Sequence, residues 1–79
     1  MSEIVDLDAR GLQCPLPLLK LKQQLNRMTE GDQVRVQTTD GGSVRDFQAF
    51  VRQTGHIMHV CDTVDGVYLF LIEKSSGPR

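Results

Sequence analysis

The sequence predicts a two-layer α/β (α+β) sandwich of order βαβαββ, in which two helices cover one face of a four-stranded mixed sheet. Three observations lead to this fold class. The spacing of apolar residues changes twice from the period of a strand to that of a helix and back. An Asp-Gly pair then separates two strand-like segments near the C-terminus. Finally, 79 residues of which 39% are hydrophobic can build one small core but not two.

The first half of the chain predicts a strand, a helix and a second strand. Residues 4–8 alternate apolar and acidic side chains, as a half-buried strand does. From Pro15 onward, apolar residues recur three and four positions apart, which is typical of an amphipathic helix. These residues are Leu18, Leu21, Leu25 and Met28. Residues 33–38 alternate again, after a turn at Gly31-Asp32.

The second half predicts a helix and then two strands. Residues 43–54 carry an apolar stripe at helical spacing, with Ser43 as the expected N-cap and Gly55 as the left-handed residue that ends the helix. Residues 56–62 and 67–73 are the last two strands, and the Asp-Gly turn makes them an antiparallel hairpin. Because residues 67–73 are apolar on both faces, we expect them at the centre of the sheet.

Composition narrows the classes of function. Nine Lys and Arg against ten Asp and Glu give a net charge of −1, which argues against direct nucleic-acid binding. The N-terminus is acidic, without the apolar segment of a signal peptide, and the longest apolar run, residues 67–72, is too short to cross a membrane. We therefore expect a cytoplasmic protein without membrane insertion, with reduced cysteines. We expect one domain over residues 1–79, ordered at about 3–74 with a flexible tail at 75–79, and a monomer when free.

The most informative segment surrounds Cys14. Pro15 and Pro17 fit the first and third positions of a helix, where the missing N–H groups cost little, and this places Cys14 at or near the N-cap. We expect the amide of Leu16 and the helix dipole to favour anionic sulfur and to lower the pKa of the Cys14 thiol. Gly11 lets the backbone turn, so that the sulfur lies at the tip of a loop.

Several other roles of the two cysteines are disfavoured. A buried Cys14 acting as a small hydrophobe fits poorly with two prolines around a leucine. A protease-type nucleophile needs a base, but His56 and His59 are expected at the opposite edge of the sheet. A metal site is not expected, because a strand places His59 and Cys61 on one face and His56 on the other. We expect Cys61 to fill the core or a sheet face.

The loops after the first two strands are expected to open on the same edge of the sheet. Thr39, Asp40 and Ser43 would then be neighbours of Cys14 and candidates for contact with a partner protein. Arg10 is a further docking candidate in the same loop as Cys14. For Arg10 and Asp40 a solvated loop charge and an Asx-turn are equally good interpretations.

At this point the sequence resembles the TusA/SirA family of small sulfur-transfer proteins. The pattern Asp-x-x-Gly-Leu-x-Cys-Pro-x-Pro stands at residues 8–17, and the resemblance extends over residues 4–74, including the Arg45-Asp46 pair. It implies that Cys14 accepts persulfide sulfur from a cysteine desulfurase or a rhodanese-like donor. It further implies relay to an acceptor protein in tRNA thiolation, cofactor biosynthesis or sulfur metabolism. The implied site is Cys14, supported by Pro15, Leu16, Pro17 and Gly11, with no metal and no cofactor.

A second function of another class stays open. Small βαβαββ domains also serve as regulatory or RNA-associated binding modules without chemistry of their own. The acidic balance of charges and the four aromatic residues argue against RNA. Whether the chain is an enzyme by itself is also open, since a sulfurtransferase-type carrier would act together with partner enzymes.

Overall fold

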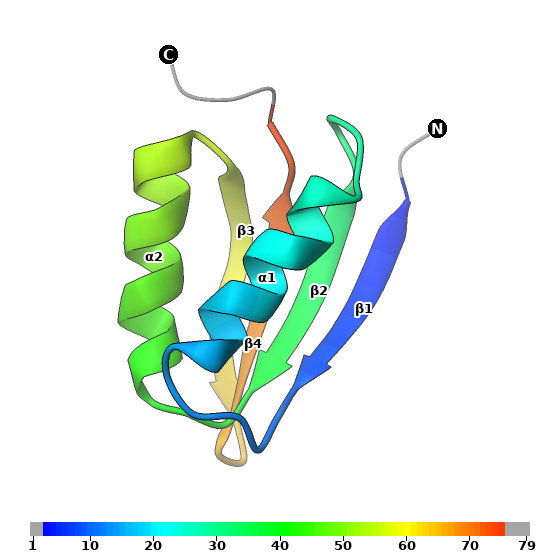
Figure 1. Ribbon diagram of the computed structural model, residues 1–79. Helices are drawn as coiled ribbons and strands as arrows, with labels where there is room; N and C mark the ends of the chain where they lie inside the picture. Colours follow the sequence, from blue (N-terminus) through cyan, green and yellow to red (C-terminus); the bar gives the residue numbers. More distant parts are fainter. Residues whose placement is uncertain (1–2, 76–79) are drawn as a thin grey trace.

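A computed structural model describes residues 3–75 of the chain. It contains four strands and two helices in the predicted order, with two helices on one face of the sheet (Figure 1). The elements are β1 (Ile4–Ala9), α1 (Leu16–Asn26), β2 (Gln33–Thr38), α2 (Gly42–Thr54), β3 (Ile57–Val64) and β4 (Val67–Glu73). The predicted fold class is therefore confirmed.

The strands lie in the order β1-β2-β4-β3. β1 and β2 are parallel, as a strand-helix-strand unit requires, whereas β4 runs antiparallel to both of its neighbours. β4 lies at the centre of the sheet because Phe70 and Ile72 face the helices while Leu69 and Leu71 occupy the other face. This confirms the expectation from its continuous apolar run.

The core lies between the sheet and the two helices. The apolar stripe of each helix supplies one side of it and the inward residues of β1, β2 and β4 the other. The buried apolar residues are Ala9, Leu21, Leu25, Met28, Val34, Val36, Phe47, Val51, Phe70 and Ile72. At its centre the rings of Phe47 and Phe70 pack with their centroids 4.5 Å apart.

The turns follow the sequence signals. Gly55 ends α2 at φ 85°, and its N–H donates to the Val51 carbonyl. Asp65 and Gly66 form the two-residue hairpin turn with φ of 51° and 80°. Both residues therefore have the positive φ that a type I′ turn requires.

The third strand differs most from its prediction. It begins at Ile57 and runs to Val64, because the hairpin needs only two turn residues. Its pairing with β4 shifts register between Met58 and Val60, which leaves His59 in a bulge.

The ends of the chain add two observations. Ser75 is held by a hydrogen bond from its N–H to His56 Nδ1 at 3.0 Å. The rest of the predicted flexible tail, residues 76–79, lies outside the described residues. Within residues 3–75, neither helix is long and apolar enough to cross a membrane.

Candidate functional site

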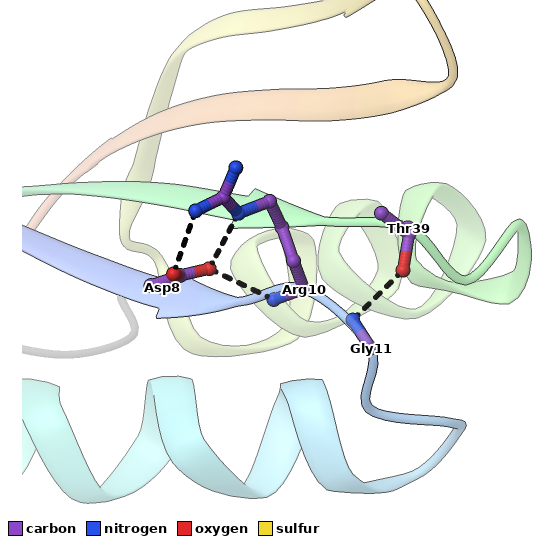
Figure 2. A network of polar contacts seen from close by, with 4 residues as sticks. All are labelled: Asp8, Arg10, Gly11 and Thr39. Atoms are coloured by element: carbon purple, nitrogen blue, oxygen red, sulfur yellow. Dashed lines mark hydrogen bonds and ion pairs between the residues drawn. The ribbon is translucent and has the colours of Figure 1, made fainter.

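Cys14 lies in the loop between β1 and α1 and is exposed. Gly11 opens this loop at φ 82°, where a side chain would be strained. The N–H of Gly11 donates to Thr39 Oγ1 at 2.9 Å (Figure 2). This bond ties the loop after β1 to the loop after β2, so the predicted proximity of the two loops is confirmed.

The start of α1 is shifted by one residue from its prediction. Pro15 is the N-cap and the helix begins at Leu16, so Cys14 lies one position further out. Pro17 is the second helical residue and is buried. The Leu16 N–H donates to the Gln13 carbonyl at 2.8 Å, so it is not the partner of the sulfur that the sequence suggested.

The sulfur instead contacts a carboxylate from the second helix. The Cys14 S–H donates to Asp46 Oδ2, with the two atoms 2.9 Å apart. This hydrogen bond is the main cause that raises the pKa of the Cys14 thiol above its ordinary value, followed by desolvation and the charges of Asp46 and Asp40. The expectation of a lowered pKa is therefore wrong, because it considered only the helix dipole and the nearby amides.

The N-terminus of α2 lies next to the Cys14 sulfur. Gly41 is the N-cap and Ser43 is the second helical residue. Asp40 forms an Asx-turn, accepting the Gly42 N–H at 3.0 Å, and this turn precedes the helix. A Cβ on Gly42 would lie 3.0 Å from Asp40 Oδ2 and 3.8 Å from Cys14 Cβ, so the glycine leaves space at the thiol.

The predicted capping role of Ser43 is wrong. Its side chain is 2% exposed, and its hydroxyl has no hydrogen-bond partner among residues 3–75. Because Ser43 is turned into the interior, it is also unavailable to a partner protein. Asp46, three residues later, binds Cys14 instead of completing a capping box.

Arg10 does not reach the sulfur. Its guanidinium pairs with Asp8 at 2.9 Å, and its N–H donates to the same carboxylate (Figure 2). Figure 2 shows this pair on the side of β1 away from α1. The bonds from Arg10 lower the pKa of Asp8 to about 2. Arg10 is therefore an exposed charge that pairs within its own loop and does not contact Cys14, and its role as a docking residue stays a prediction.

Cys61 and the two histidines lie on or beside β3. Cys61 is exposed and lies outside the core, so of its two expected placements only the sheet face remains. Its sulfur accepts a hydrogen bond from Gln48 of α2 at 3.7 Å. His59 instead pairs with Glu73 at 2.8 Å, on the sheet face opposite the helices. His59 and Cys61 therefore do not share a face, because the bulge interrupts the alternation. No group of His, Cys, Asp and Glu within residues 3–75 is arranged to hold a metal ion.

Two apolar side chains in the first four residues of α1 are exposed. Leu16 is 44% exposed and Leu19 is 48% exposed. Met28, which the sequence placed in the apolar stripe that begins at Leu18, is buried in the core. The site therefore consists of an exposed thiol, a carboxylate bonded to it and two exposed leucines on the adjacent helix.

Comparison with known proteins gives a consistent result. A sequence model described as Sulfurtransferase TusA matches residues 5–74. The sulfur carrier protein TusA of Allochromatium vinosum is 49% identical over 70 residues, covering 89% of this chain and 92% of the relative. A putative sulfur carrier protein of Neisseria meningitidis serogroup A is 46% identical over 67 residues, covering 85% and 90%. The crystal structure of a SirA-like protein from Desulfitobacterium hafniense superimposes with a TM-score of 0.78 at 25% identity, covering 91% of this chain and 99% of that one.

Proposed function

The chain belongs to the TusA family of sulfurtransferases, and we propose that its Cys14 carries sulfur as a persulfide between two partner proteins. One observation carries the proposal. Cys14 lies within the family's Cys-Pro-x-Pro pattern and is the exposed thiol of the loop that precedes α1. An exposed sulfur on a small domain can enter the active site of a larger enzyme.

The proposed donor is a cysteine desulfurase or a rhodanese-like protein that holds a persulfide. The Cys14 sulfur attacks the outer sulfur of this persulfide. A new S–S bond forms at Cys14 while the donor's S–S bond breaks, and the donor's cysteine leaves as a thiolate. The Cys14 proton ends on that thiolate, so the reaction is a balanced exchange that needs no further oxidant or reductant.

The surroundings of Cys14 favour a carrier over a self-sufficient enzyme. The group bonded to the sulfur is a carboxylate, which does not promote thiolate formation. His56 and His59 are engaged with Ser75 and Glu73. Activation of the sulfur therefore falls to the partner protein, whose active site supplies the cationic or hydrogen-bonding groups.

The proposed contact surface consists of the exposed leucines and the neighbouring loops. Leu16 and Leu19 supply exposed apolar area in the first four residues of α1. Asp40 acts on the Cys14 sulfur through its charge, and Thr39 joins the loop after β2 to the loop that carries Cys14. The acceptor is a relay protein of tRNA thiolation, cofactor biosynthesis or sulfur metabolism.

The proposal is tested by mass measurement of the intact protein. The chain is incubated with a cysteine desulfurase and cysteine, or with a rhodanese and thiosulfate. We expect a gain of one sulfur atom that a reductant removes, that is lost in Cys14→Ser and that persists in Cys61→Ser. Failure of both donor systems to load any sulfur, with the protein folded, would contradict the proposal and favour a binding module without sulfur chemistry.

A further inference from the structure

Asp46 is the side chain that holds the Cys14 sulfur. It lies near the N-terminus of α2, 32 residues along the chain from Cys14, and the two meet where the N-terminal ends of both helices lie at the same edge of the sheet (Figure 1). The 2.9 Å separation of Sγ and Oδ2 is short for a thiol hydrogen bond. A contact made across two elements aligns the sulfur more firmly than the loop could alone.

The bond allows only one protonation state of the sulfur. A carboxylate accepts hydrogen bonds, and a thiolate also accepts only, so the contact exists while the thiol keeps its proton. The charged groups that act on the sulfur are Asp46 and Asp40, both negative. Arg45, next to Asp46, is exposed and forms no ion pair within the described residues 3–75. Within the described residues, neither Asp46 nor Asp40 forms an ion pair with a cationic side chain.

We propose that Asp46 is a positioning residue for sulfur transfer, which holds the unloaded Cys14 sulfur as a neutral S–H directed at α2 and turns an anionic persulfide away from α2. This inference rests on the proposed function. During uptake the Cys14 proton passes to the departing donor thiolate, and the Asp46 carboxylate loses its hydrogen-bond donor. The outer sulfur of the loaded persulfide, once ionised, is repelled by that carboxylate and points outward, where an acceptor can reach it.

The first test measures the rate at which Cys14 is alkylated by neutral iodoacetamide as a function of pH. Cys61→Ser serves as the background, so that one thiol reacts. We expect Asp46→Asn to react severalfold faster than its background at neutral pH and to reach its plateau at a lower pH, because the thiolate is the reacting form. Asp40→Asn is the matched control: it removes an equal charge that does not touch the sulfur, so its effect should be smaller.

The second test compares a cationic and an anionic methanethiosulfonate reagent on the same proteins. The carboxylates should make the cationic reagent the faster one, and Asp46→Asn should reduce this preference more than Asp40→Asn does. Circular dichroism checks that each variant is folded, and Asp46→Ala provides a second substitution. Equal pH profiles and equal reagent preferences for Asp46→Asn and the background would overturn the inference.

Neither readout requires a sulfur donor. If Cys14 takes up no sulfur but Asp46→Asn shifts the alkylation profile, the proposed function is wrong while Asp46 still controls the charge on the sulfur. If sulfur is taken up normally and the profile does not shift, the inference about Asp46 fails alone.

Discussion

Phe47 connects the stability of the fold to the position of the site. It follows Asp46 in α2, is fully buried, and stacks against Phe70 of the central strand with the ring planes tilted by 52°. Truncating this ring removes the contact that holds the N-terminal half of α2 on the sheet. Phe47→Ala is therefore expected to be among the most destabilising substitutions in the protein.

The magnitude follows from burial. Truncation of a fully buried phenylalanine costs about 3–5 kcal/mol, the sum of lost transfer free energy and the cavity left behind. A 79-residue domain has a free energy of unfolding of about 4–12 kcal/mol, at roughly 0.05–0.15 kcal/mol per residue. Phe47→Ala should thus remove a large part of the stability, and lower the melting temperature by at least about 12 °C if each kcal/mol is worth about 4 °C.

Urea unfolding followed by circular dichroism measures this loss, and Phe50→Ala is the matched control. Phe50 lies on the same helix but is only half-buried, at the rim of the core. Its truncation should cost roughly 1–2 kcal/mol, because part of the ring is already in water. A loss below about 1 kcal/mol for Phe47→Ala, or equal losses for the two variants, would refute the assignment of Phe47 to the centre of the core.

Three further predictions concern Ser43, Arg10 and Asp8. Ser43→Ala should leave the free energy of unfolding unchanged or raise it by about 1 kcal/mol, because it removes a buried hydroxyl that has no partner among residues 3–75; a clear loss in urea unfolding would show that the hydroxyl is satisfied. Arg10→Ala should leave the alkylation rate of Cys14 unchanged, since Arg10 pairs with Asp8 on the side of β1 away from α1. A changed rate would show that Arg10 acts on the Cys14 sulfur. The pKa of Asp8 is about 2 in the folded protein, below its ordinary value of 3.8. Its small contribution to stability should therefore be present above that ordinary value and be lost as the pH falls through about 2, and Arg10→Ala should weaken this dependence in acid titration.

Much of the fold was predictable because it depends on local spacing. The alternation in residues 33–38 and the helical stripe ending at Val51 identify their elements without knowledge of the rest of the chain. The central place of β4 followed from its apolar character on both faces, and the hairpin from the Asp-Gly turn. The bulge at His59 leaves no comparable pattern in the sequence, because it arises from the pairing of β3 with β4. A regular strand was assumed there, so His59 and Cys61 were wrongly predicted to share a sheet face.

The site was predictable in its nucleophile but not in its environment. The proline pair indicated a displayed thiol at Cys14, and the thiol is exposed. The contact with Asp46 joins two elements far apart in sequence, so it depends on where α2 begins. That start is set by the Asx-turn at Asp40, two residues before the helix, and it turned Ser43 inward. The only signal for Asp46 was its place in the Arg45-Asp46 pair of the family resemblance.

We expect Cys14, and not Cys61, to carry the transferred sulfur. The unsubstituted protein is sufficient to test this. Tryptic cleavage after Arg10 and Lys20 places Cys14 on residues 11–20, whereas cleavage after Arg52 and Lys74 places Cys61 on residues 53–74. After loading from rhodanese and thiosulfate and alkylation to trap persulfides, the peptides are measured by mass spectrometry. We expect one additional sulfur atom on the peptide of residues 11–20. Additional sulfur confined to the peptide of residues 53–74, or absent from both, would contradict it.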